Sequence, residues 1–205
     1  MRLGRAIAER LRAEGWRVIT SSHRADAGAD IVADLAEPMG AAKLYSAALQ
    51  ILGGTPPDAL VNNAALFTGD AAVIAAANLE APKKLTMLMA GRETGVGAVV
   101  NILDTKALDA SRCLPTSIDT YLAAKRALLD FTRSAAATFA ATLRVNGVAP
   151  GPVLAPTEVH VKAGETLLDR RPTADDVAAA VSYLLSAEST TGAIIPVDAG
   201  QHLVK

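Results

Sequence analysis

The sequence contains very little cysteine and no long uninterrupted apolar stretch, and its positive and negative charges nearly cancel. Cys113 is the single cysteine among 205 residues, so no internal disulfide can form and a reducing compartment is indicated. A net charge of -1 gives no reason to expect nucleic acid or an anionic membrane as a partner. No run approaches the roughly 20 apolar residues that cross a bilayer. The first 15 residues carry six charges, unlike a signal peptide, so we expect a cytoplasmic protein.

Short apolar stretches of β type alternate with segments of helical periodicity along the whole chain. With 51% hydrophobic and 20% charged residues, the sequence predicts one globular domain, residues 1–205. The expected strands cover residues 16–20, 31–33, 59–61, 97–103, 143–148 and 193–197. The expected helices cover a segment from residue 3 to Gly15, then 39–52, 71–89, 121–141 and the segment after the capping-box pair Thr173 and Asp176. This alternation predicts an α/β fold, a Rossmann-like doubly wound parallel sheet in three α/β/α layers.

Polar residues and glycine follow the expected strands at the point where each strand ends. In a parallel sheet these carboxyl ends share one edge, and ligands bind there. The residues concerned are Ser21 to Arg24, Asp34, Asn62, Asn63, Asp104, Pro150 and Gly151. Their coincidence at one edge predicts a binding site.

Tyr121 and Lys125 stand four residues apart at the start of an Ala-rich run without glycine or proline, so one helix face carries both. A free tyrosine titrates near pH ~10. A fixed neighbouring cation favours the phenolate and lowers its pKa, which suits tyrosine to proton transfer at neutral pH. A Tyr–Lys pair at this spacing usually has only a structural role. Motifs elsewhere in the chain are needed to favour a catalytic role.

Eight short motifs supply that support. They are Gly4 opening a helix, Asp34-Leu35, Asn62-Asn63-Ala64-Ala65, Asn78 in the next helix, Asn101-Ile102 in a strand, Tyr121 with Lys125, Asn146 before Pro150-Gly151, and Thr191-Gly192 before Val197-Asp198. In this order they resemble the short-chain dehydrogenase/reductase family along nearly the whole chain.

Within that family, the chain is most similar to the pteridine-reductase branch. Arg2-Leu3-Gly4-Arg5 matches that branch's variant of the phosphate loop, and His23-Arg24 matches its basic residues after the second strand. Phe67 stands where a stacking aromatic follows the Asn-Asn-Ala turn. Asp104 stands at a strand end where most of the family has serine and this branch has aspartate.

The family resemblance implies hydride transfer from a nicotinamide cofactor to a carbonyl or C=N carbon, with Tyr121 supplying a proton. It implies that Lys125 lowers the phenol pKa and binds the nicotinamide ribose. Asp104 would orient substrate or pass a proton, unless it is a solvated carboxylate at a strand end. Asn78 would hold a water in a proton relay, unless it is a solvent-facing Asn. Phe67 would stack on a flat heterocycle. The alternative is that Phe67 is a loop residue whose ring covers the core.

The same resemblance implies where the cofactor lies. His23 and Arg24 would accommodate a 2′-phosphate, which favours NADPH over NADH. Arg2 and Leu3 would belong to the phosphate loop, Asp34 and Leu35 would flank the adenine, and Asn63 and Ala64 would line the cofactor. Pro150 and Gly151 would let backbone meet the nicotinamide, although a plain turn explains them almost as well. No metal site is predicted.

The front of the chain departs from the family. A dinucleotide-binding fold begins with a strand and a Gly-rich turn before the first helix, whereas this chain begins with Met1-Arg2-Leu3-Gly4. In the family, that first strand lies in the middle of the sheet. The chain could start downstream of the true beginning, the remaining strands could close the gap, or another chain could fill it. In each case we expect weak or absent NADPH binding to the chain as written.

The spacing between Asp104 and Tyr121 also departs from the family. The 17-residue separation is longer than the family usually leaves, so we infer an insertion within residues 107–117. The insertion could carry Asp104 out of register with Tyr121, or it could simply bulge the loop. Ser111 is a fallback candidate.

Three functions are therefore in competition. The first is an NADPH-dependent reductase of a small, flat, pterin-like substrate. The second is the same fold reducing another carbonyl, such as a 3-oxoacyl thioester or a sugar ketone. The third is a catalytically inactive remnant or binding protein, because the phosphate loop is truncated. The resemblance also implies a homo-oligomer, a dimer or tetramer.

Overall fold

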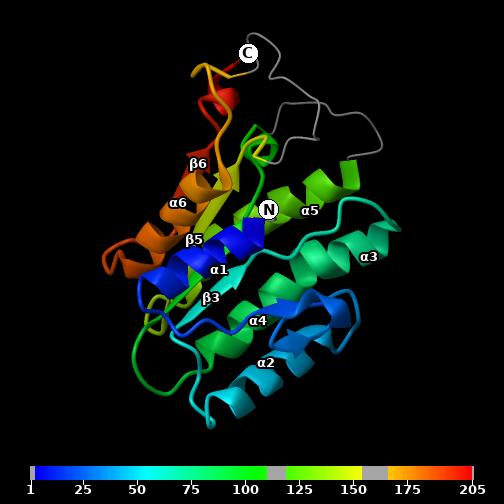
Figure 1. Ribbon diagram of the computed structural model, residues 1–205, viewed down its shortest axis with the longest axis vertical. Helices are drawn as coiled ribbons and strands as arrows, with labels where there is room; N and C mark the ends of the chain where they lie inside the picture. Colours follow the sequence, from blue (N-terminus) through cyan, green and yellow to red (C-terminus); the bar gives the residue numbers. More distant parts are fainter. Residues whose placement is uncertain (1–2, 110–118, 154–165, 205) are drawn as a thin grey trace.

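The structure, a computed structural model, describes residues 3–109, 119–153 and 166–204. Helices and strands alternate along the chain, as the sequence predicts (Figure 1). The helices are α1 (Leu3–Ala13), α2 (Gly40–Ile51), α3 (Ala71–Ala75), α4 (Ala81–Ala90), α5 (Asp119–Thr138) and α6 (Ala174–Ser186). The strands are β1 (Ser21–Ser22), β2 (Ile31–Val32), β3 (Ala59–Asn62), β4 (Gly97–Ile102), β5 (Leu143–Pro150) and β6 (Ile194–Val197). Short turns of helix, η1 (Ala25–Ala27), η2 (Ala76–Glu80), η3 (Thr105–Ala107) and η4 (Gln201–Leu203), connect or extend them.

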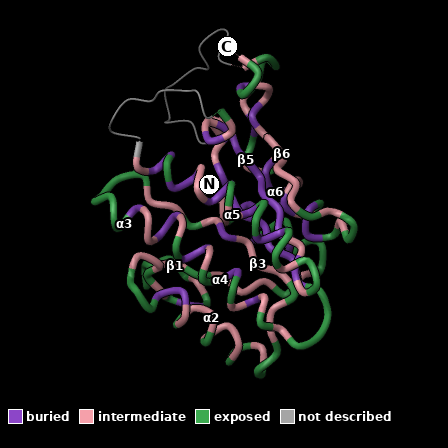
Figure 2. The backbone as a smooth tube through the Cα atoms, turned by 180° about the vertical axis from the view of Figure 1, so that it is seen from behind, coloured by how far each residue is buried: buried purple, intermediate pink, exposed green. Residues whose placement is uncertain are grey.

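Every strand pairing is parallel, which confirms the doubly wound α/β prediction. Four strands form the main sheet in the order β3-β4-β5-β6. All six residues of β4 are buried, because both faces of this strand are covered. Alternate residues of β4 face opposite layers: Val100 packs in the cluster that contains α1 and α6, and Val99 packs with residues of α4 and α5. Figure 2 shows the buried residues concentrated along β5 and its flanking helices.

The sheet is interrupted on the outer side of β3. β1 and β2 pair only with each other and form a separate two-stranded sheet. The prediction of a strand at residues 16–20 is wrong, because hydrogen bonding to β2 makes a strand only of Ser21 and Ser22. Among the described residues, no strand pairs with the outer edge of β3, and three of the four β3 residues are only half-buried. No described strand therefore takes the place of the family's first strand, and the remaining strands do not close the gap.

The helical segment predicted at residues 71–89 is confirmed, with one irregular turn. Residues 76–80 form a π-helical turn that contains Asn78, and α3 and α4 continue it on either side. Pro82 lies in the first turn of α4 and has no N–H, so it cannot donate the regular helix bond to the carbonyl of Asn78. Such π turns are frequent at functional sites.

The other predicted elements lie within a few residues of their expected bounds. The capping box is present, since the Thr173 side chain accepts from the Asp176 N–H and the Asp176 carboxylate accepts from the Thr173 N–H. Gly15 ends α1 with a φ of 91°, a conformation that favours glycine. In the described ranges, no helix has both the length and the apolarity needed to cross a bilayer.

Candidate active site

The predicted site residues gather at the carboxyl edge of the main sheet. Asn62 ends β3, Asp104 follows β4, and Pro150 ends β5. The first turns of α5 bring Tyr121 and Lys125 back over the end of β4, and the register places Asn62 directly opposite Asn101. Parallel strands with aligned ends make this convergence possible.

Tyr121 and Asp104 are in contact despite their long spacing in the chain. The Tyr121 hydroxyl donates to Oδ2 of Asp104 at 3.2 Å. The other carboxylate oxygen, Oδ1, accepts from the Lys106 N–H at 2.8 Å and caps η3. The expectation that the insertion carries Asp104 out of register is wrong. The solvated-carboxylate alternative is wrong too, since Asp104 is half-buried and bonded at both oxygens. Ser111 lies outside the described residues.

Burial controls the protonation of Tyr121. Its side chain is 6% exposed and packs with Ile74, Ala107 and Leu122. Burial raises the pKa of Tyr121 above its ordinary value, and the charge of Asp104 and the hydrogen bond to it raise it further. The prediction that Lys125 lowers this pKa is not confirmed. The Lys125 ammonium lies 5.8 Å from the centre of the phenol ring and donates elsewhere.

Lys125 is a buried amine with unused hydrogen-bonding capacity. It is 2% exposed, and Nζ donates to the carbonyl of Ile102 at 2.7 Å. Burial lowers its pKa to about 8, and the charge of Asp104 opposes this decrease. An ammonium has three N–H donors, and within the described ranges only the Ile102 carbonyl receives one. The remaining donors suit the hydroxyl groups of a sugar at this edge of the sheet.

Three polar side chains link the layers beneath the site. Asn62 Nδ2 donates to Asn101 Oδ1 at 2.8 Å, and Asn101 Nδ2 donates to Thr132 Oγ1 at 2.9 Å. All three residues are buried, and they come from β3, β4 and α5 respectively. Asn62 is therefore structural, in line with the expectation that it only ties the turn to the sheet.

Asn78 is fully buried, so the solvent-facing alternative is wrong. Its Oδ1 accepts from the Leu66 N–H at 2.8 Å, and its Nδ2 donates to the Leu66 carbonyl at 2.7 Å. Both ends of the amide are thus bonded to the loop that follows β3, and the side chain anchors that loop. The water-holding role stays a prediction.

Phe67 follows directly on the residue that Asn78 anchors. Its ring stacks on the ring of Tyr121, with centroids 4.5 Å apart and an interplanar angle of 30°. The side chain is nevertheless 64% exposed. Phe67 therefore covers the phenol rather than the general core, and it offers a flat apolar surface to solvent beside the proton-bearing group.

The predicted cofactor residues at the front of the chain surround the start of α1. A Cβ added to Gly4 would lie 2.6 Å from Asn63 Nδ2, so a larger residue there would displace the end of the Asn63 side chain. The Leu3 side chain packs against the core cluster of α1 and α6, so it contributes to the core. Ala64 is exposed next to Asn63. Arg2 lies outside the described residues.

The predicted adenosine-side residues lie on the separate two-stranded sheet and the loop after it. His23 and Arg24 are exposed just after β1. Asp34 is exposed, and its carboxylate accepts from the Ala36 N–H at 2.8 Å within its own turn. The Leu35 side chain packs against the cluster between α2 and α4. His23 and Arg24 thus lie outside the core, whereas the Leu35 side chain packs partly within it.

Pro150 is the last residue of β5, and Gly151 follows it directly. The Gly151 N–H donates to the Val197 carbonyl at 3.0 Å. A Cβ on Gly151 would lie 2.7 Å from the Cβ of Asp198, so the close approach that requires glycine is to the neighbouring strand. Sequence reasoning missed Asp198 as a site residue, although its place after the last apolar strand puts it at the same edge.

Comparisons with known proteins agree with this geometry. The family model for enoyl-(acyl carrier protein) reductase matches residues 2–202. A Streptomyces violaceoruber protein described as ketoacyl reductase 2 of the granaticin polyketide synthase is 31% identical, over 98% of this chain and 92% of its own. Pteridine reductase 1 of Leishmania tarentolae is 29% identical, over 100% of this chain and 94% of its own. The solved structure of FolM alternative dihydrofolate reductase 1 from Brucella canis with NADP has a TM-score of 0.87 and 30% identity, covering 100% of this chain and 91% of that one.

Proposed function

Because the chain belongs to the short-chain dehydrogenase/reductase family, we propose that this NAD(P)-dependent oxidoreductase uses NADPH to reduce a small carbonyl or C=N substrate, with a flat pterin-like heterocycle favoured. The observation that carries the proposal is the stack of Phe67 on Tyr121, with the Tyr121 hydroxyl bonded to Asp104. An exposed aromatic face, a buried proton donor and a carboxylate thereby meet in one place.

The exposed ring of Phe67 favours a flat substrate. Stacked aromatic pairs gain about 0.5–1.5 kcal/mol beyond the area that they bury, and a planar heterocycle can make the same contact. Two of the similar proteins are named as reductases of such rings, the pteridine reductase of Leishmania tarentolae and the alternative dihydrofolate reductase of Brucella canis. Their names support this substrate class for the present chain.

The chain's own residues account for the proton side of the reaction. NADPH supplies the hydride when it is bound. The raised pKa keeps the Tyr121 phenol protonated at neutral pH, ready to donate to the oxygen or nitrogen that gains electron density. Asp104 orients the hydroxyl through its hydrogen bond, and the ammonium of Lys125 lies 5.8 Å from the centre of the phenol ring.

Several residues suit a phosphorylated dinucleotide. The N–H donors of Lys125 that meet no acceptor among the described residues fit the hydroxyls of a ribose, and the small exposed side chain of Ala64 permits close approach of a ligand. His23 and Arg24 are exposed after β1, and the guanidinium of Arg24 favours the 2′-phosphate of NADPH over the free hydroxyl of NADH. Three similar solved structures contain NADP or NADPH.

Another carbonyl substrate is the first alternative. One relative and one similar solved structure are described as ketoacyl reductases, which favours a 3-oxoacyl thioester. A panel of purified substrates separates the alternatives: a dihydropterin, a 3-oxoacyl thioester and a sugar ketone, each with NADPH and with NADH, and with Tyr121→Phe as the matched control. We expect NADPH consumption with the pterin that is lost in the Tyr121→Phe variant. Consumption with only the thioester or the sugar would replace the proposed substrate class.

A binding protein without catalysis is the second alternative, and the interrupted sheet favours it. Within the described ranges, no strand pairs with the outer edge of β3, so no strand-to-helix turn at that place offers backbone donors to the cofactor phosphates.

We expect the 205-residue chain to bind NADPH weakly in a titration of nicotinamide fluorescence. In the same titration we expect Arg24→Glu to weaken the binding of NADPH more than the binding of NADH. Micromolar NADPH affinity would contradict the expected weakness, and equal losses for both cofactors would contradict the role of Arg24.

We also propose that the protein is cytoplasmic and forms a homo-oligomer, a dimer or a tetramer, without nucleic-acid or membrane partners. The nearly balanced charge and the family membership support this assignment. Light scattering on the purified chain measures the oligomeric state directly, and a monomer across a wide concentration range would overturn it.

A further inference from the structure

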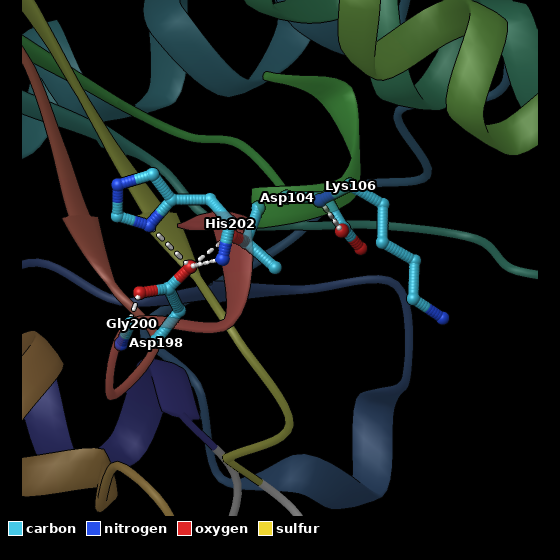
Figure 3. Close-up of polar contacts among 6 residues, drawn as sticks. Asp104, Lys106, Asp198, Gly200 and His202 are labelled. Atoms are coloured by element: carbon cyan, nitrogen blue, oxygen red, sulfur yellow. Dashed lines mark hydrogen bonds and ion pairs between the residues drawn. The ribbon is translucent and has the colours of Figure 1, made fainter. Parts of the chain in front are cut away.

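Asp198 is a buried carboxylate at the end of β6 that takes no part in the mechanism above. It is 3% exposed. Its Oδ1 accepts from the Gly200 N–H at 3.0 Å, and its Oδ2 accepts from the His202 N–H at 2.8 Å and lies 2.8 Å from the His202 Nδ1 (Figure 3). The same Oδ2 accepts from the hydroxyl of Thr105. Four contacts from three residues therefore converge on one side chain.

The contact with Thr105 joins the segments that follow β4 and β6, two strands that are not neighbours in the sheet. β5 lies between β4 and β6, so Asp198 must reach Thr105 past the end of β5. Gly151 stands at that place, and a Cβ there would approach the Asp198 Cβ to 2.7 Å and its Cα to 2.8 Å. Because Gly151 has no side chain, Asp198 can lie close to the end of β5.

Thr105 is the residue directly after Asp104 and the first residue of η3. It is buried, and the Asp104 carboxylate caps the same short turn through the Lys106 N–H. The position of the Asp104 carboxylate therefore depends on the position of η3. η3 is only three residues long, so its own hydrogen bonds fix it weakly, and the anchor at Thr105 restrains it from outside.

We propose that Asp198, acting through the Thr105 hydroxyl, is a positioning residue that holds the Asp104 carboxylate against the Tyr121 phenol, and that it thereby couples the C-terminal turn to the catalytic pair. The geometry of this link does not depend on which substrate is reduced. Its effect on turnover rests on the proposed function.

The charge on Asp198 supports the link. Burial tends to raise the pKa of Asp198, but the hydrogen bonds from Thr105, His202 and Gly200 outweigh it and hold the pKa below its ordinary value. The carboxylate is thus ionised at neutral pH, and hydrogen bonds to an ionised acceptor are stronger than those between neutral groups. Thr105 is therefore held by a charge-assisted bond.

Thr105→Val tests the link, because valine keeps the shape of threonine and removes only the hydroxyl. Thr105→Ser is the matched control that restores a hydroxyl, and Thr105→Ala is the second variant if valine does not fold. The readout is the ring Cζ resonance of Tyr121 in protein labelled with ¹³C-tyrosine, which reports the hydrogen bond of the phenol. Tyr121→Phe assigns the resonance among those of Tyr45 and Tyr183, and Asp104→Asn shows its position when the charged acceptor is lost.

We expect the Tyr121 resonance of Thr105→Val to move at least halfway from its wild-type position to the position in Asp104→Asn. We expect Thr105→Ser to keep the wild-type position. A Thr105→Val resonance at the wild-type position would overturn the inference, as would an equal displacement in the valine and serine variants. This measurement does not require turnover, so it separates a failure of the inference from a failure of the proposed function.

Turnover of the proposed substrate provides the second readout. A small displacement of a catalytic group reduces rates steeply, so we expect Thr105→Val to lower kcat by roughly tenfold or more, with the KM for NADPH unchanged. Thr105→Ser should restore kcat. A merely structural Thr105 predicts the opposite pattern, a lower Tm with the same kcat, and that result would overturn the positioning role.

Discussion

The hydroxyl of Tyr121 lies 3.2 Å from a carboxylate oxygen of Asp104, although 17 residues separate the two in the chain. Asp104 caps η3 directly after β4, and α5 returns Tyr121 to that strand end. A negative charge therefore stands beside a buried phenol, and both conditions make the phenol harder to ionise. Lys125 is the compensating charge, but its amine donates to the Ile102 carbonyl and not to the phenol. In this arrangement the resting form of Tyr121 is a protonated donor.

Tyr121→Phe tests whether the phenol is the proton donor. Phenylalanine keeps the ring that stacks on Phe67 and removes the hydroxyl that contacts Asp104. General acid catalysis contributes typically about 10²–10⁴-fold, so we expect kcat for NADPH-dependent reduction to fall by that factor with little change in KM. Tyr183→Phe, on the exposed side of α6, is the control and should retain full activity. A Tyr121→Phe variant with wild-type kcat would exclude the proposed role.

Asp104→Asn tests the influence of the carboxylate on the phenol. The variant removes the charge of Asp104 and leaves the burial of Tyr121, which is the larger cause of its raised pKa. We therefore expect the Tyr121 pKa to fall but to stay above the value of a free tyrosine. The absorbance of the phenolate at alkaline pH measures the Tyr121 pKa. Subtracting the titration curve of Tyr121→Phe leaves the contribution of Tyr121 alone. Asp130→Asn, on the exposed face of α5, is the control. An unchanged titration in Asp104→Asn would show that the two groups are not coupled.

Local patterns in the sequence predicted most of the fold and the placement of Tyr121 and Lys125 on one helix. The apolar run at residues 97–103 predicts a buried strand, and β4 forms there over Gly97–Ile102 with every residue buried. Tyr121 and Lys125 share a helix face because they stand four residues apart. The failed strand at residues 16–20 shows the limit of such patterns. Strand formation requires a partner on the adjacent edge, and the sequence of one segment does not show whether that partner is present.

Predictions about individual polar atoms were less successful, since their partners lie far away in the chain. Asn78 bonds the main chain of Leu66, 12 residues away, and Asn62 bonds Asn101, 39 residues away. The contact between Thr105 and Asp198 spans 93 residues. A sequence pattern identifies which residues reach the edge of the sheet. It does not decide which donor meets which acceptor there, because that depends on strand order and on close approaches such as the one at Gly151.

Phe67→Ala tests the aromatic surface beside Tyr121. The variant removes the exposed ring, so a flat substrate loses a stacking contact of about 0.5–1.5 kcal/mol. We expect the KM of a pterin-like substrate to rise by roughly 2- to 13-fold, which is that energy expressed as a ratio, while the KM of a small aliphatic carbonyl changes little. Phe67→Tyr retains a ring and is the matched control. A uniform effect on flat and aliphatic substrates would mean that Phe67 acts only through the packing of Tyr121.

Lys125→Met should increase stability while it removes activity. In the folded protein the Lys125 pKa is about 8, against 10.5 for an ordinary lysine. Between these two values the unfolded chain binds more protons than the folded one, so the free energy of unfolding rises with pH across that window. Below it, the folded protein carries a buried ammonium at a penalty of about 3 kcal/mol, since a tenfold change in the proton dissociation constant corresponds to about 1.4 kcal/mol. Methionine fills a similar volume without the charge.

At neutral pH we therefore expect Lys125→Met to raise the free energy of unfolding by about 2 kcal/mol, because loss of the hydrogen bond to Ile102 offsets about 1 kcal/mol of the gain. Urea unfolding at neutral pH measures the stability gained by the variant. Urea unfolding at alkaline pH should show a smaller gain, since the cost of burying the Lys125 ammonium in the wild type disappears as the pH rises past the pKa of an ordinary lysine. Lys84→Met, exposed on α4, is the control and should change neither stability nor its pH dependence. A Lys125→Met variant that is less stable than the wild type at neutral pH would show that the amine is held by stronger interactions than its bond to the Ile102 carbonyl. A stabilised but inactive variant would show that the chain retains a buried charge at the expense of stability because catalysis requires it.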